Sequence, residues 1–307
     1  ISKGMADLSE QDNLTFAADT LAFVRYFYER SNDSEQLAFT NLARIGRISL
    51  AGGMVTQPDT NLVAEPGIVW DIFAGHRWVN GTLGLPPSSV SMQCDPFGHS
   101  PSLPIILAQS GYAYLYIGRS GQGQNLPLIF WWISPVDNST KVLTYNLGYW
   151  EGDFLRGVED PSTVKDRLLD LVDMLEGRTR STTLLLLVGT DFVDFSNTLT
   201  KLTDRWNGEY LGETGVGLVV GTPEEFFERV ASHELDKIPS LSVDINPLWQ
   251  GFYGTRPQGR ASERLSEYYL TTFDKYLPIL RYVDTDLQDK IEEADELRWL
   301  SSMNHHH

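Results

Sequence analysis

Two aspartates, each at the end of a short apolar run, are the residues with the clearest chemical potential in this sequence. Residues 90–94 are predicted to form a buried strand, which ends in the turn Asp95-Pro-Phe-Gly-His. Residues 183–188 are a second continuous apolar run, typical of a strand covered on both faces, and this run leads into Gly-Thr-Asp191-Phe. Because catalytic residues gather at the C-terminal ends of parallel strands, Asp95 and Asp191 are predicted to face one cleft.

Two carboxyl groups in one cleft can divide the work of a displacement reaction. An ionised carboxylate attacks as a nucleophile, while a carboxylic acid protonates the leaving oxygen and later activates water. Retaining glycoside hydrolysis uses this division, with the two groups roughly 5 Å apart. For Asp95 taken alone, the alternative is a turn-forming aspartate before a proline.

The sequence around Asp95 resembles the signature of the class II α-mannosidases, glycoside hydrolase family 38. The motif Asp-Pro-Phe-Gly-His-Ser occupies residues 95–100, and Arg119 follows the next predicted strand, residues 113–117. The resemblance runs along most of the chain. It implies a zinc-dependent, retaining exo-α-mannosidase that acts on mannose-containing oligosaccharides or glycoprotein glycans.

The resemblance also implies roles for individual residues. Asp95 would be the nucleophile and a zinc ligand, and Asp191 the acid/base. Arg119 would hydrogen-bond the nucleophile and orient it. Phe97 would form part of an aromatic wall against the sugar ring, and His99 is expected to have a structural role beside the turn.

The sequence departs from the family pattern at the zinc site. It contains no His-x-Asp pair, which is expected upstream of residue 1, since the chain lacks an initiator Met and looks like a segment of a longer protein. A downstream histidine ligand would fall on His306, in the final Asn-His-His-His run, which could equally be the start of a polyhistidine tag. Zinc prefers four N, O or S ligands, so Asp95 and His306 would supply at most two.

The other side chains that could react or bind a ligand are expected to have structural roles. Cys94 is expected to be a small buried residue, and as a single cysteine it excludes an internal disulfide. His76, alone on a predicted helix, is expected to be structural. Trp131 and Trp132 could line a sugar site, although core packing is the expected role.

Alternating helices and strands are predicted to position the two aspartates. Strands are predicted at residues 47–50, 90–94, 113–117, 128–133, 141–145, 183–188 and 215–220. Helices are predicted at residues 14–30, 33–43, 67–80, 101–110, 160–175 and 196–206, and from residue 222 onward. This alternation implies a parallel α/β array, and the length favours a distorted (β/α) barrel, seven-stranded in the family it resembles.

The pattern changes to long helices, residues 261–276 and 284–301, after Pro257. By resemblance this is the start of an α-helical bundle middle domain. The predicted domains are therefore 1–257, the catalytic barrel, and 258–307.

The composition limits the partners. Lys and Arg number 24 against 41 Asp and Glu, giving a net charge of −17, which repels nucleic acid and anionic lipid. No apolar run is long enough to insert into a membrane. Glycosylation sequons at Asn13, Asn80 and Asn138 hint at a secretory or lysosomal route but do not decide the compartment.

Two other functions stay open. One is a non-catalytic carbohydrate-binding relative that has lost its metal. The other is a metal-dependent sugar deacetylase on a related barrel, which does not account for the Gly-Thr-Asp191-Phe strand end.

Overall fold

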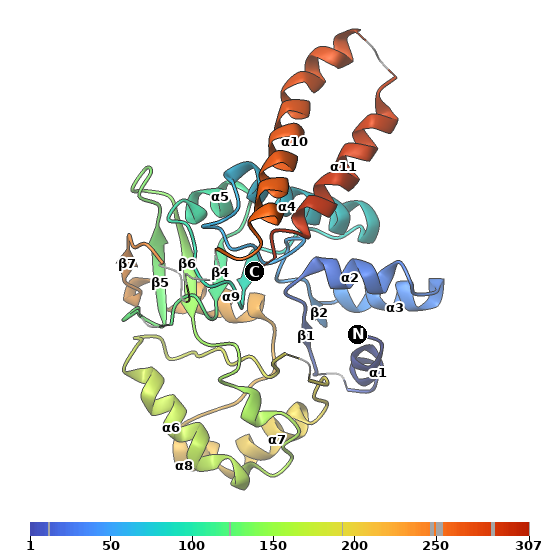
Figure 1. Ribbon diagram of the computed structural model, residues 1–307. Helices are drawn as coiled ribbons and strands as arrows, with labels where there is room; N and C mark the ends of the chain where they lie inside the picture. The colour runs from blue at the N-terminus through green and yellow to red at the C-terminus, as the bar shows by residue number, and fades with distance from the viewer. Residues whose placement is uncertain are drawn as a thin grey trace.

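The computed structural model describes residues 1–11, 13–122, 124–191, 193–245, 249, 254–283 and 286–306. The architecture is α/β, with a sheet flanked by helices and a pair of long helices projecting from it (Figure 1). The strands are β1 Phe16–Ala17, β2 Ile48–Ser49, β3 Val90–Gln93, β4 Tyr114–Ile117, β5 Ile129–Ile133, β6 Lys141–Asn146 and β7 Ser240–Leu241. The α-helices are α1 Ser2–Glu10, α2 Leu21–Tyr28, α3 Asp33–Arg44, α4 Glu65–Trp78, α5 Leu103–Gln109, α6 Lys165–Glu176, α7 Leu199–Glu209, α8 Leu211–Thr214, α9 Pro223–His233, α10 Pro257–Val283 and α11 Gln288–Ser302.

The main sheet has the strand order β3-β4-β6-β5-β7, and β1 and β2 form a second, parallel pair. The two sheets meet where Met92 N–H donates to Ala51 O at 3.1 Å. Strands β3, β4 and β6 are parallel to one another, which positions their C-terminal ends along one edge. Within the described residues no ladder joins β7 back to β1, so closure of the predicted barrel is not shown.

The predicted parallel array does not include the β5–β6 pair, because β5 runs antiparallel to β6. The connection between them is a short turn in which Asp137 accepts hydrogen bonds from the backbone N–H groups of Ser139 and Thr140. A connection this short can make a hairpin, whereas parallel neighbours need a crossover of a dozen residues or more.

Two predicted strands, residues 183–188 and 215–220, carry no strand pairing. In the first, the phenol of Tyr145 exchanges two hydrogen bonds of 3.0 Å with the backbone of Leu185. In the second, the amide of Asn207 bonds both the N–H and the carbonyl of Leu218. Side chains therefore satisfy backbone groups that a neighbouring strand would otherwise satisfy.

The predicted helix at residues 14–30 is also corrected, because it divides into β1 and α2. Phe16 N–H donates to Arg47 O at 2.9 Å and Ala18 N–H to Ser49 O at 2.8 Å, extending the pairing with β2. The backbone of Asp19 then packs against Gly52, where a Cβ would lie 1.8 Å from the Asp19 carbonyl oxygen. Tertiary pairing overrides the local helical pattern at this site.

The core lies on both faces of the main sheet. One cluster contains Tyr116, Tyr145 and the two phenylalanines of α9, Phe226 and Phe227. The cluster on the other face includes Trp132, which is fully buried and donates its indole N–H to Val243 O at 2.9 Å. Core packing is thus the role of Trp132, as expected.

The long helices predicted after Pro257 are confirmed as α10 and α11, although the predicted start at residue 284 lies outside the described residues. They form a hairpin whose base rests on α4 (Figure 1). Arg298 of α11 is buried and pairs with Asp274 of α10 and with Asp295. No helix in the described part of the chain is long and apolar enough to cross a membrane.

Candidate active site

The ends of β3 and β4 place Asp95 and Arg119 side by side. The parallel pairing continues past the strands, because Gly118 N–H donates to Gln93 O at 3.0 Å and Arg119 N–H to Cys94 O at 2.9 Å. A glycine permits this close approach, since a Cβ on Gly118 would lie 2.1 Å from the Cys94 carbonyl oxygen. Nε of Arg119 then forms an ion pair with Oδ1 of Asp95.

The ion pair is only partly accessible, with 20 % of the Arg119 side chain and 21 % of the Asp95 side chain exposed. Burial disfavours the guanidinium charge, but the hydrogen bond and attraction of Asp95 outweigh it and raise the pKa of Arg119. Arg119 therefore presents a fixed positive charge that orients Asp95.

Tyr149, which follows β6, connects this ion pair to Asp191. Leu147 N–H donates to Ile117 O at 3.2 Å, so the chain after β6 stays beside the end of β4. The Tyr149 hydroxyl accepts a hydrogen bond from Nη2 of Arg119 and donates one to Oδ2 of Asp191, each 3.2 Å long. Burial and the negative charge of Asp95 raise the pKa of Tyr149 to about 12, so the phenol stays protonated. The two predicted catalytic carboxylates are thus linked through two intervening side chains.

Aromatic rings surround the guanidinium of Arg119. Its Cζ lies 5.2–5.9 Å from the ring centroids of Phe97, Tyr149, Trp150 and Trp249. The rings of Phe97 and Trp249 are 5.3 Å apart, and Trp249 is 67 % exposed. Phe97 therefore belongs to an aromatic surface beside Asp95, the kind of surface on which a sugar ring can stack.

The buried side chain of Gln57 stabilises the turn that carries Asp95. The side-chain carbonyl of Gln57 accepts hydrogen bonds from the backbone N–H groups of Cys94, at 2.6 Å, and Asp95, at 3.2 Å. Its amide donates to Oδ2 of Asp19 at 2.6 Å. Burial raises the pKa of the Asp19 carboxyl despite that hydrogen bond, and burial together with Asp19 raises the pKa of the Cys94 thiol well above its usual value. Cys94 is therefore an unreactive buried thiol, as expected.

Two histidines have the structural positions expected of them. His99 is fully buried, with Nδ1 3.4 Å from Thr60 Oγ1 and its backbone N–H bonded to Ile245 O. Burial lowers the pKa of His99 to about 3, so the ring stays neutral. His76 lies 3.0 Å from the hydroxyl of Tyr112, and burial lowers its pKa as well.

The residues around Asp95 do not form a zinc shell within the described part of the chain. Among the residues that the structure describes, no group of three or more His, Cys, Asp or Glu ligand atoms gathers there. An isolated β-bridge joins His306 to Pro58, next to Gln57, so the C-terminal segment does return to this edge of the sheet. Zinc needs about four donors, and Asp95 with His306 falls short of them, so no chemical step is assigned to a metal.

Sequence reasoning missed Asp19, Gln57 and Tyr149. Asp19 follows strand β1 as Asp95 follows β3, a signal hidden by the predicted helix. Tyr149 comes shortly after the predicted strand at residues 141–145, where a contribution to the same edge could have been expected. Gln57 had no comparable signal, because its role depends on the neighbouring β3 turn.

The α/β domain thus carries Asp95 at the end of β3 and joins it through Arg119 and Tyr149 to Asp191. Residues 1–251 match the glycosyl hydrolases family 38 N-terminal domain, and the chain belongs to this family. Alpha-mannosidase 2 of Drosophila melanogaster is 24 % identical over an alignment that covers all of this chain and 33 % of that protein. The chain thus spans about a third of this relative.

Solved structures support the fold. An α-mannosidase from Enterococcus faecalis V583 superposes with a TM-score of 0.67 at 16 % identity, covering 78 % of this chain and 27 % of that one. A 4-alpha-glucanotransferase from Thermococcus litoralis gives a TM-score of 0.54 at 11 % identity, covering 98 % and 49 %. At these identities the likeness extends to the fold alone.

Proposed function

We propose that this chain provides the catalytic carboxylates of a retaining α-mannosidase that removes terminal α-linked mannose from oligosaccharides or glycoprotein glycans. The observation that carries the proposal is the hydrogen-bonded line from Asp95 through Arg119 and Tyr149 to Asp191. Family membership and relatives named as α-mannosidases supply the substrate class. The roles of Asp95 as nucleophile and Asp191 as acid/base are those that the family resemblance implies, and their positions at the two ends of that line support them.

In the first step Asp95 attacks the anomeric carbon and the bond to the leaving oxygen breaks. Asp191, which is exposed and can reach solvent, gives its proton to that oxygen. In the second step Asp191 takes a proton from water, and the resulting hydroxide displaces Asp95 from the sugar. Arg119 keeps the Asp95 carboxylate aimed throughout, while the aromatic surface of Phe97 faces the ring.

The family resemblance implies zinc dependence, with Asp95 and His306 as ligands. Zinc would supply a positive charge for binding sugar hydroxyls. The donors described around Asp95 support the alternative of a carbohydrate-binding relative without its metal.

Mechanism-based labelling tests the proposal in the full-length protein that contains this chain. A fluorinated mannosyl fluoride should form a stable ester on Asp95, detected by peptide mass spectrometry, because the slowed intermediate accumulates. Labelling of another residue would refute the assignment of Asp95. Mannoside binding without labelling or turnover would favour the binding-protein alternative.

A further inference from the structure

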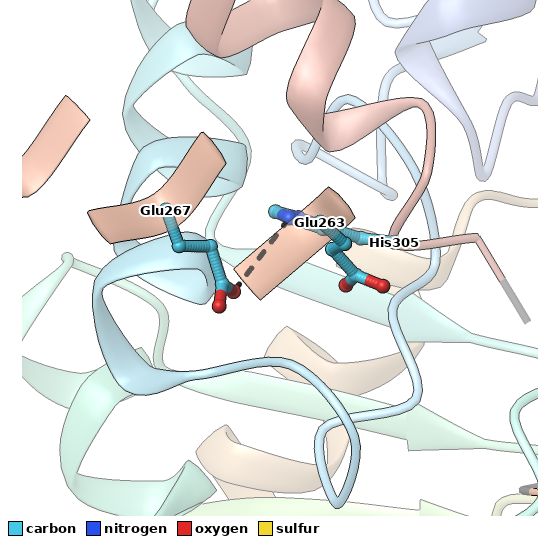
Figure 2. A group of neighbouring side chains, drawn as sticks. All are labelled: Glu263, Glu267 and His305. Atoms are coloured by element: carbon cyan, nitrogen blue, oxygen red, sulfur yellow. Dashed lines mark ion pairs between the residues drawn. The ribbon is translucent and has the colours of Figure 1, made fainter. Parts of the chain in front are cut away.

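Two glutamates of α10 and a histidine after α11 converge where the helical hairpin rests on α4. Glu263 and Glu267 are one helical turn apart and share a face of α10. Glu263, Glu267 and His305 are 5 %, 4 % and 1 % exposed. One ligand atom from each lies within 4.8 Å of the other two. The dashed line in Figure 2 joins His305 and Glu267. The distance from Nε2 of His305 to Oε1 of Glu267 is 4.0 Å.

The cluster contains buried polar atoms that no hydrogen bond satisfies. Among the described residues, both ring nitrogens of His305 and Oε1 of Glu263 have no hydrogen-bond partner. Native interiors rarely leave such atoms unsatisfied, because each one loses its hydration without replacement. A buried imidazole without a hydrogen-bond partner, close to buried carboxylate oxygens, therefore indicates a bound group.

Two arginines of α10 hold the glutamate carboxylates in place through their Oε2 atoms. Oε2 of Glu263 pairs with Arg260 at 3.2 Å, and Oε2 of Glu267 pairs with Arg264 at 2.8 Å. Oε1 of Glu267 also accepts the backbone N–H of Ala64 at 3.0 Å, which leaves a second lone pair on that oxygen. This Oε1 of Glu267 is the carboxylate oxygen that lies 4.0 Å from Nε2 of His305.

Asp71 of α4 lies behind the imidazole. Its Oδ2 is 3.5 Å from Nδ1 of His305, and Thr56 holds the carboxylate through its N–H at 2.9 Å and its hydroxyl at 2.8 Å. A carboxylate on one ring nitrogen with a metal on the other is the usual environment of a metal-bound histidine. Here that arrangement leaves Nε2 directed at the glutamates.

The space beside the cluster is kept open by Gly67 of α4. A Cβ on Gly67 would lie 2.6 Å from Oε1 of Glu267 and 3.0 Å from Cε1 of His305. A larger residue would therefore fill the position next to the converging atoms.

We propose that Glu263, Glu267 and His305 bind one divalent metal ion of the zinc class, with Asp71 orienting His305. Carboxylate oxygens and imidazole nitrogens are ligands that Zn²⁺ takes in proteins. Tetrahedral donors about 2.0–2.2 Å from zinc lie about 3.4 Å apart, so the side chains close by roughly 1 Å on binding. The ion fastens the hairpin to α4 and is separate from the chemistry at Asp95.

Metal analysis of the purified chain tests this site. The chain is first stripped of metal with a chelator and then dialysed against micromolar Zn²⁺. Plasma mass spectrometry should then find one zinc ion per chain. The double variant Glu263→Gln, Glu267→Gln and the single variant His305→Asn should each lose at least 90 % of that zinc. Glu293→Gln, an exposed glutamate on α11, is the matched control and should retain it.

Two further variants separate this site from other sources of zinc. His306→Ala with His307→Ala should keep the zinc ion, because neither of these two histidines is a proposed ligand. Asp95→Asn should also keep it, whether or not the proposed mannosidase activity is correct. Loss of zinc in either variant would overturn the assignment.

Thermal unfolding provides a second readout that does not depend on the variants folding. Zinc at 100 times its dissociation constant should raise the unfolding midpoint of the wild-type chain by several degrees, since a ligand that binds the folded state stabilises it. Mg²⁺ should have little effect. X-ray absorption of the zinc-loaded chain should show one imidazole and oxygen donors. A shell of three imidazoles, or no zinc retained by the wild-type chain, would refute the proposal.

Discussion

The hydroxyl of Tyr149 donates a hydrogen bond of 3.2 Å to Oδ2 of Asp191 while accepting one from Arg119. One phenol therefore joins the proposed acid/base to the residue that orients the proposed nucleophile. Because burial and Asp95 raise the pKa of Tyr149 to about 12, this link persists throughout the neutral range. The activity predictions below apply to the full-length protein that contains this chain.

Replacing Tyr149 by phenylalanine removes the link and keeps the ring. A hydrogen bond of this kind is worth about 0.5–1.5 kcal/mol, so kcat should fall about 2- to 10-fold with little change in KM. Steady-state kinetics with an aryl α-mannoside measures the effect. Tyr268→Phe on the exposed surface of α10 is the control and should be silent, and unchanged kinetics in Tyr149→Phe would exclude a role for the link.

Asp191→Asn should slow substrates with poor leaving groups far more than activated ones. General acid assistance contributes about 100- to 10,000-fold and matters less when the leaving group is already stable. The comparison uses aryl α-mannosides whose phenols differ in pKa. Asp194→Asn, an exposed aspartate nearby with 82 % side-chain exposure, should leave both rates intact. Equal losses on both substrates in Asp191→Asn would count against its role as the acid.

Gly118→Ala should separate Arg119 from Asp95 through the backbone. The added Cβ would meet the Cys94 carbonyl at 2.1 Å, so the ends of β3 and β4 must move apart. We expect a loss of more than about 2 kcal/mol in the free energy of unfolding, measured by urea denaturation. Gly208→Ala in α7 meets no atom within 4 Å and should instead stabilise by about 0.5–1 kcal/mol. Similar stabilities for the two variants would show that the close approach is unimportant.

His99 should make the fold sensitive to acid. Burial lowers the pKa of His99 from 6.5 to about 3. Below pH 6.5 the imidazole therefore binds a proton in the unfolded chain but stays neutral in the folded chain. The contribution of neutral His99 to the free energy of unfolding is therefore fully present above pH 6.5 and is lost as the pH falls towards 3. The free energy of unfolding falls by about 1.36 kcal/mol for each pH unit below 6.5. We therefore expect a loss of about 2 kcal/mol between pH 7.5 and 5.0.

Urea denaturation of His99→Asn at those two pH values tests the assignment. The variant should lose less stability than the wild type on acidification, whereas His233→Asn, at an exposed position in α9, should behave like the wild type. The same acid sensitivity in His99→Asn would mean that other groups cause it.

The sequence by itself determined the features that neighbouring residues encode. The helix predicted from residue 222 onward is α9, and Thr222 is its N-cap. The Thr222 side chain accepts the backbone N–H of Glu225, and the Glu225 side chain accepts the backbone N–H of Thr222. The Asp95 motif and Arg119 identified the edge of the sheet that carries the candidate site. These signals are local, because capping and periodicity depend on residues a few positions apart.

Only the tertiary structure decided which distant groups meet. The apolar run at residues 183–188 is only half-buried against the core, and Tyr145 satisfies the backbone of Leu185, while in the described part of the chain no strand pairs with the run. Tyr149 bonds Asp191, and Glu267 meets His305, across stretches of chain whose spacing encodes no contact. The physical reason is that a buried backbone group or carboxylate forms its hydrogen bonds with the polar groups that lie next to it in the folded chain. Which groups lie there depends on how all the segments pack together.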